Sequence, residues 1–439
     1  MADHKQELSD DTPYLTSPTV ISDAALARCF VGLTVAETEG ATEVDLANNL
    51  PPADNLKRFL SVKSVLSTSS SNAIAQQEAA EGADEAVLEE IGVGQCGVVF
   101  NIRGTGLVVK RATGMPYFTR QIKPDFESHI KVYKSHRGVQ DVLVPEPIEF
   151  IEASDYFDWQ TRHEAFFEPQ YREPACLLVS QRILPLPKPI RTSLIDLFCP
   201  LGRQEVSKLD RSNRSCLVRL YLGARLARVG TTTPFSLRNF ELTLDRMATI
   251  GLEPIDFARS MGSSLATVHW AAKVDGRDIE YVLGSAPTRP EPKESQSSPS
   301  GSTDRMNTAS LNFRRRTVNM WLLDFNQCEP VSLSEAGVHQ CVRAYWDNDP
   351  YYPRPNVDEQ LWQVFSIAYK ERGNEIIPGS TLPSRFIAEI EAKAAMMREG
   401  GSSRPSLPPP LGPPKGLGAS DSVKTDVKKK RKGPRYAPT

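Results

Sequence analysis

The sequence lacks cysteines at the spacing of a metal site. Its seven cysteines are scattered, no two form a C-x-x-C pair, and no H-x₃₋₅-H pair follows any of them. A structural zinc ion needs four closely placed ligands, so this pattern predicts a protein without zinc. An odd number of unpatterned cysteines also favours reduced thiols, which are typical of an intracellular protein.

The chain also lacks long apolar runs and a large net charge. No run approaches the ~20 apolar residues that span a bilayer, and the polar, acidic start does not read as a signal peptide. The sequence therefore predicts no membrane partner and a nuclear or cytoplasmic location. The formal net charge of −2 gives no overall field that would favour nucleic acid.

Changes in composition along the sequence divide the chain into four parts. An acidic N-terminal region is expected to be mostly flexible, with at most short helices at 22–31 and 52–66. A β-rich part, a helical part and a basic, Pro-rich, disordered tail follow. The predicted boundaries are 1–85, 86–183, 184–398 and 399–439, with a disordered Ser- and Pro-rich insertion at 286–311.

The tail carries a strongly basic run, Lys428–Lys432. Such a run is typical of a nuclear localisation signal, and it is also typical of a solvated tail. Contact with nucleic acid is expected only through this tail, because the lysine and arginine side chains there would neutralise the phosphates of the nucleic acid.

The β-rich part contains a glycine pattern followed by a lysine. Gly92, Gly94 and Gly97 stand at G-x-G-x-x-G spacing, and Lys110 ends an apolar run. A glycine turn between strands lets backbone N–H groups approach phosphates, and a lysine behind it neutralises their charge. The same glycines also suit an ordinary turn. Strands are expected at 87–91, 97–102, 106–112, 144–151 and 176–183, with a helix at 124–136.

A lysine in such a site needs an acid to hold it. Glu127 lies on the helix that follows and faces inward if Phe126 and Ile130 pack against the sheet. A Lys110–Glu127 pair would fix the ammonium group where nucleotide phosphates bind. Asp125 is the competing candidate.

The helical part has two short strands with acids beside them. Asp275 stands five residues before Glu280, and Asp324 directly follows Trp-Leu-Leu. An acid at the end of an apolar strand is costly to bury without a partner, and Mg²⁺ is a suitable partner because it prefers oxygen ligands. Asp275 also suits a simple turn cap. The strands are expected at 279–283 and 318–323, and helices at 213–227, 254–270, 333–347, 357–372 and 383–398.

In this order the motifs resemble the protein-kinase-like superfamily, which includes aminoglycoside phosphotransferase-like enzymes. The likeness covers about residues 86–398. It implies an α+β, two-lobed kinase-like fold, with a β-rich N-lobe and a mostly helical C-lobe. It also implies ATP and Mg²⁺ as cofactors in the cleft between the lobes.

The resemblance assigns roles to single residues. Gly92, Gly94 and Gly97 would cover the phosphates, and Lys110, held by Glu127, would neutralise their charge. Asp275 would accept the proton of the acceptor hydroxyl, with Arg277 near the transferred phosphate. Asp324 and Glu280 would bind the metal.

Three stretches also resemble a family of uncharacterised fungal proteins. They are IGVGQCGVVF, HWAAKVDGRDIEYVLG, and WLLDFNQCEP with AYWDNDPYYPRP. The last belongs to a domain of unknown function, here 318–372, that carries a zinc finger label. Zinc is not carried over to this chain, because the finger spacing is missing.

The sequence supports three functional hypotheses. The first is a kinase-like protein that binds nucleotide, with phosphotransfer to an unknown acceptor. The second is a catalytically inactive pseudokinase that acts as a scaffold for a protein partner. It is favoured because no histidine stands two residues before Asp275, and because Glu280 and Asn326 replace the usual asparagine and glycine. The third is an α+β interaction protein without nucleotide.

Overall fold

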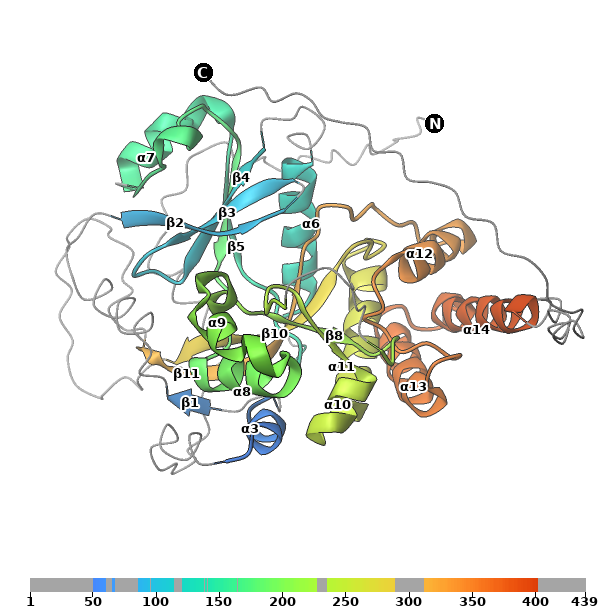
Figure 1. Ribbon diagram of the computed structural model, residues 1–439. Helices are drawn as coiled ribbons and strands as arrows, with labels where there is room; N and C mark the ends of the chain where they lie inside the picture. Colours follow the sequence, from blue (N-terminus) through green and yellow to red (C-terminus); the bar gives the residue numbers. More distant parts are fainter. Residues whose placement is uncertain are drawn as a thin grey trace, which may run out of the picture.

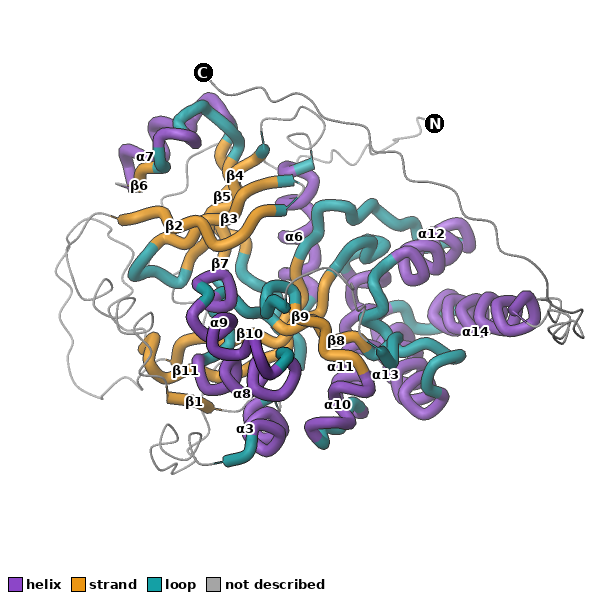
Figure 2. Tube along the Cα trace, viewed as in Figure 1, coloured by secondary structure: helices purple, strands orange, loops and turns teal. Residues whose placement is uncertain are grey.

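The computed structural model is built on two β-sheets, with helices around them (Figures 1 and 2). The expected helix at 22–31, the insertion beyond Thr288 and the tail beyond Gly401 lie outside the described residues. Within the described part of the chain, no helix is both long and apolar enough to cross a membrane. The structure describes residues 50–60, 65–67, 86–94, 96–113, 121–137, 139, 141–163, 165–226, 235–288 and 312–401.

The six-stranded sheet has the order β5-β7-β4-β3-β2-β6, and all neighbours are antiparallel except β2 and β6. On one face Phe100 and Val109 pack into a core with Trp159 of α7. Helix α6 lies by the opposite face (Figure 1). The elements are β2 (Ala86–Val93), β3 (Gly97–Ile102), β4 (Leu107–Ala112), α6 (Ile122–Ser135), β5 (Pro147–Ile151), α7 (Tyr156–His163), β6 (Ala165–Phe166) and β7 (Leu177–Gln181).

The five-stranded sheet has the order β1-β11-β10-β8-β9. Its centre is the β10–β11 hairpin, in which Glu280 pairs with Leu323 and the apolar residues that follow continue the register. This pairing brings the start of β10 beside the end of β11, so the acids at these two positions lie near each other. The strands are β1 (Val65–Ser67), β8 (Val218–Tyr221), β9 (Phe240–Thr243), β10 (Glu280–Thr288) and β11 (Asn312–Leu323).

Helices surround the second sheet and enclose the larger core. Helices α11 and α13 approach closely at Gly262, where a Cβ would lie 2.4 Å from the carbonyl oxygen of Phe365. The helices are α3 (Pro52–Phe59), α8 (Lys188–Phe198), α9 (Gln204–Leu209), α10 (Leu244–Ile250), α11 (Ile255–Ala266), α12 (Glu335–Asp347), α13 (Glu359–Ile376) and α14 (Leu382–Gly401).

The sequence predicted a helix at 213–227, of which the structure describes 213–226. Val218–Tyr221 form β8 instead, which pairs with β10 on one side and β9 on the other. Val218 and Leu220 are fully buried and Arg219 between them is half-buried, so the side chains alternate as in a strand. The spacing of the apolar residues suited both a helix and a strand. The segment forms a strand because it lies between two other strands and pairs with both.

Helix α3 lies in a region that the sequence predicted to be mostly flexible. Its apolar side chains Leu56 and Phe59, with Leu60 behind them, are buried in the large core, against α8 and α10. Asn55 Nδ2 also reaches Ser193 Oγ of α8, at 3.4 Å. This N-terminal helix is therefore an integral part of the larger core.

Replacing Phe59 by alanine tests the docking of α3. Phe59 is 1% exposed, so the substitution should lower the free energy of unfolding by about 3–5 kcal/mol through lost burial and a cavity. Chemical denaturation measures this. Phe157→Ala is the matched control, because Phe157 is 56% exposed and its loss should cost less than about 0.5 kcal/mol. Equal effects of the two substitutions would contradict the docked helix.

Candidate functional site

A cavity of about 330 Å³ lies between the two sheets. Strands β2, β3, β4 and β7 and helix α6 line one side of it. The segment that follows β11 and the loops beside β8 and β9 line the other. Apolar side chains dominate the lining, and its acids Asp125 and Asp324 both lie beside Lys110. The apolar lining residues include Ile91, Val93, Val99, Val108, Leu178, Ile183, Leu217 and Leu323.

The predicted glycine turn lies at the mouth of this cavity. Gly94 N donates to Gly97 O at 2.9 Å, which closes the β2–β3 hairpin. A Cβ on Gly97 would lie 2.6 Å from the carbonyl oxygen of Arg111, so this glycine is needed for the packing of β3 on β4. Apart from its chain neighbours, a Cβ on Gly92 or Gly94 would meet no atom of the described residues closer than 3.8 Å. These two glycines therefore leave open space over the cavity.

Cys96 fastens the same hairpin across the cavity. Its Sγ donates to Gln121 Oε1 at 2.9 Å and accepts from Asn326 Nδ2 at 3.1 Å. Burial raises the pKa of this thiol, and Lys110 opposes the shift. Cys96 thus remains a neutral thiol that joins the hairpin to the segment after β11.

Lys110 is held by Asp125 and not by the expected Glu127. Lys110 Nζ lies 2.7 Å from Asp125 Oδ2, and their side chains are 18% and 5% exposed. Glu127 is exposed on the outer face of α6. Burial alone would lower the pKa of Lys110, but the carboxylates of Asp125 and Asp324 outweigh it and raise this pKa. The lysine is therefore charged, and it faces the cavity.

Asp324 faces Lys110 from the other sheet. Its Oδ1 lies 3.6 Å from Lys110 Nζ and has no hydrogen-bond partner among the described residues. Its backbone has φ of 64°, a left-handed conformation that only Asn, Asp and Gly adopt readily. The next residue, Phe325, packs on His129 of α6 with ring centroids 4.9 Å apart. This contact fixes the direction of Asp324.

Burial raises the pKa of Asp324, and Lys110 opposes that shift. A carboxylate oxygen that is buried and lacks a hydrogen bond is unfavourable unless another cation or donor reaches it. Of the two acids in the cavity lining, Asp324 is therefore the one with an oxygen that lacks a hydrogen bond among the described residues.

Glu280, an expected metal ligand, is already paired with a cation. Arg219 Nη2 of β8 forms a short ion pair with Glu280 Oε1, and Arg219 Nη1 lies 3.5 Å from Asp349 Oδ2. Burial, with Asp324 and Asp278 nearby, raises the pKa of Glu280 to about 7 although Arg219 opposes it. An arginine therefore stands where the resemblance would place a metal ion.

Asp275 and Arg277 lie away from the cavity. Asp275 is buried, and its Oδ1 accepts from Arg277 N and Glu329 N at 3.1 and 3.0 Å. Its Oδ2 accepts from Gln340 Nε2 at 3.0 Å. The Arg277 side chain is exposed, and neither residue lines the cavity. Asp275 thus joins its loop to the segment before α12 and to Gln340 within α12, and its bond with Arg277 N agrees with the turn-cap interpretation.

Sequence reasoning missed two further residues, Asp278 near Asp324 and Glu280, and Arg182 in the cavity lining. Asp278 has φ of 61°, and Gln327 Nε2 donates to its Oδ2 at 2.6 Å. Burial and the nearby Asp324 raise the pKa of Asp278. Arg182, just after β7, is buried and donates from Nη1 to Asn101 Oδ1 at 2.5 Å. The D-G-R-D turn was a signal for Asp278, whereas no motif pointed to Arg182.

The chain resembles one domain family of unknown function. Residues 320–381 match its model, whose description is "Zinc finger protein". The match covers the end of β11 and all of α12 and α13, which is well under half of the chain. No curated protein and no solved structure matches the chain. This agrees with the domain of unknown function that the sequence suggested at 318–372.

The prediction of a protein without zinc is contradicted by that family description. The prediction relied on the scattered cysteines and on the missing H-x₃₋₅-H pair. Oxygen and nitrogen donors on neighbouring helices can also hold zinc, and no cysteine spacing reveals them.

Asp125→Asn tests which acid holds Lys110. The substitution removes the close carboxylate and leaves a desolvated ammonium, so unfolding should become easier by about 2 kcal/mol. Glu127→Gln, two residues along the same helix, should change the free energy of unfolding by less than about 0.5 kcal/mol. Urea denaturation of both variants measures this, and a larger effect of Glu127→Gln would contradict the observed pair.

The raised pKa of Glu280 predicts a pH dependence. Below pH 4.5, its ordinary pKa, the carboxyl is protonated in the folded and unfolded chain alike. As the pH rises to about 7, the folded state must give up a proton that it holds more tightly. The stability of the wild type relative to Glu280→Gln should therefore fall over this range, by up to about 3 kcal/mol. Denaturation at several pH values measures the difference, and a difference that stays constant would refute it.

Proposed function

We propose that the cavity between the sheets binds a nucleotide, in a two-lobed kinase-like fold. The observation that carries this proposal is Lys110, a charged lysine that Asp125 holds 2.7 Å away in the cavity beneath the glycine hairpin. A buried cation in a cleft with open backbone above it suits an anionic ligand.

The phosphates would lie between Lys110 and the hairpin. Gly92 and Gly94 leave room for oxygen atoms to approach the backbone. Asp324, on the far side of Lys110, has an oxygen without a hydrogen bond, and a cation that accompanies the phosphates would satisfy it.

The base would lie at the other end of the cavity. Val99, Val108 and Leu217 supply apolar surface there, as expected of a pocket for a planar ring. Arg182 N donates to Gly106 O and Leu184 N donates to Ser285 O. Ile183 lies between them, lines the cavity, and has no backbone hydrogen bond within the described part of the chain. Its N–H and C=O are suited to the polar edge of a base.

Binding without phosphoryl transfer is the better supported version of this proposal. Transfer needs a carboxylate that accepts the hydroxyl proton next to the phosphate. Asp275 would have that role in a kinase, but it accepts three hydrogen bonds and lies outside the cavity lining. Glu280 is occupied by Arg219. We therefore favour a nucleotide-binding pseudokinase-like module that acts through a protein partner.

Thermal unfolding with and without ATP, in the presence and absence of magnesium, tests nucleotide binding. A ligand that binds only the folded state raises the unfolding midpoint. ATP should raise it for the wild type, and Lys110→Met should abolish the increase. Lys123→Ala is the matched control, because Lys123 is an exposed lysine of α6 paired with Glu152, and it should retain the full shift.

A shift that Lys110→Met retains would place the nucleotide elsewhere, and no shift for any protein would refute the proposal. Radiolabelled ATP separates the two versions of it. We expect binding without transfer to protein or small alcohols. Transfer that disappears in Asp324→Ala would instead establish a phosphotransferase.

A further inference from the structure

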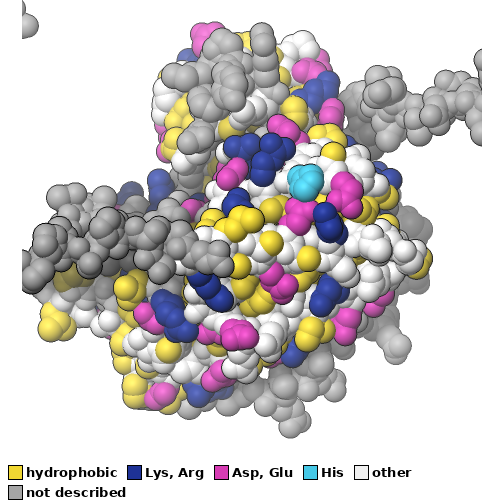
Figure 3. Space-filling model, turned by 90° about the vertical axis from the view of Figure 1, so that its right-hand side faces the viewer, with side chains coloured by type: hydrophobic (Ala, Val, Ile, Leu, Met, Phe, Trp, Pro, Cys, Tyr) yellow, Lys and Arg dark blue, Asp and Glu magenta, His cyan; other side chains and the backbone are white. Residues whose placement is uncertain are grey.

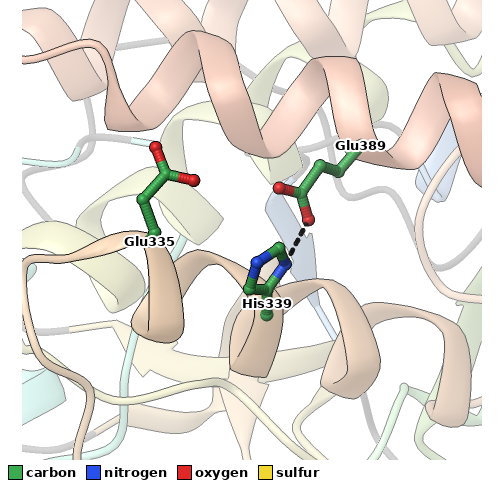
Figure 4. Close-up of side chains that lie close together, drawn as sticks. All are labelled: Glu335, His339 and Glu389. Atoms are coloured by element: carbon green, nitrogen blue, oxygen red, sulfur yellow. Dashed lines mark hydrogen bonds and ion pairs between the residues drawn. The ribbon is translucent and has the colours of Figure 1, made fainter.

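We propose that Glu335, His339 and Glu389 form a zinc site that joins α12 to α14. One donor atom from each of these side chains lies within 4.8 Å of the other two. No other His, Cys, Asp or Glu side chains among the described residues form such a group of three or more. All three side chains point into the space between the two helices (Figure 4).

The spacing of these residues on the helices explains their convergence. Glu335 and His339 are four residues apart on α12, so they lie on one face of it, one turn after the other. Glu389 comes from α14, and its Oε2 lies 2.8 Å from His339 Nδ1. Zinc binds such donors at about 2.0–2.2 Å, so atoms on one ion lie no more than about 4.4 Å apart. Small side-chain rotations would therefore complete the site.

The donor set selects the class of ion. An imidazole nitrogen suits zinc and other transition metals, whereas magnesium and calcium prefer oxygen alone. The His339 and Glu335 side chains are 60% and 62% exposed, so water can fill the remaining positions around the ion. Figure 3 shows that acidic and basic side chains are interspersed on the side of the molecule that carries α12 and α14 in Figure 1.

An arginine holds the carboxylates together when no ion is bound. Arg385 Nε lies 3.5 Å from Glu335 Oε2 and 3.3 Å from Glu389 Oε1. Without a cation between them the two carboxylates would repel each other. Arg385 is 54% exposed, so it can swing away when zinc takes its place. Arginine and zinc therefore compete for the same two acids.

The site spans the boundary of the family match. Glu335 and His339 lie inside residues 320–381, and Glu389 lies beyond them on α14. Zinc at this position would tie α14 to the matched segment. It would also provide a zinc site without cysteine, since no described cysteine belongs to a group of three or more close potential ligands.

Zinc titration of the full chain by calorimetry tests the proposal. The wild type should bind one Zn²⁺, and His339→Ala and Glu389→Gln should each weaken binding at least about tenfold, as loss of a ligand must. Arg385→Gln should strengthen binding, because it removes the competing cation. The matched controls are His163→Ala on α7 and Glu371→Gln on the exposed face of α13, and both should bind as the wild type does.

Substitution by Co²⁺ distinguishes this site from a cysteine site. The Co²⁺ protein should show weak visible absorption without the intense near-ultraviolet bands of thiolate ligands, and His339→Ala should abolish it. Thiolate bands, zinc affinity unchanged in His339→Ala, or no zinc binding by the wild type would each overturn the proposal. These readouts do not involve nucleotide, so they stand apart from the ATP experiment.

Discussion

The arrangement of the cleft depends on keeping one lysine charged away from bulk water. Removing an ammonium group from water is costly unless carboxylates replace the lost hydration. Asp125 contacts Lys110 from α6, and Asp324 approaches it from the end of β11. The six-stranded sheet, the helix beside it and the second sheet must therefore meet at this point. The contact of Phe325 with His129 and the bridge from Cys96 to Asn326 hold the same elements together.

The acids of the site follow from the same electrostatic balance. Asp125 is matched by Lys110, and Glu280 by Arg219. Asp324 lies farther from the lysine, with Oδ1 3.6 Å from Nζ, and this oxygen has no hydrogen bond among the described residues. Asp275 accepts hydrogen bonds from two backbone N–H groups and thereby fixes the loop before β10. The acids that a transfer enzyme would use to bind metal and accept a proton, Glu280 and Asp275, are thus already paired within the protein. Lys110 and the glycine hairpin still face the cavity.

The sequence predicted the features that depend on neighbours in the chain. The glycine hairpin, the strand that carries Lys110 and the acid after Trp-Leu-Leu could be found this way. The partner of Lys110 could not, because Asp125 and Glu127 are two positions apart and point to different sides of α6, so the rotation of the helix decides between them. The role of Asp275 depends on Glu329 and Gln340, more than fifty residues away in the chain. The group Glu335, His339 and Glu389 likewise needs two helices to meet.

Hydrogen–deuterium exchange with and without ATP tests the central claim most directly, because it locates the ligand without any substitution. If the nucleotide lies between Lys110 and the segment after β7, peptides that cover 91–97, 107–112 and 178–184 should exchange more slowly at saturating ATP. Peptides of α12 and α14 should be unaffected. Protection confined to other parts of the chain, or none at saturating ATP, would contradict the account.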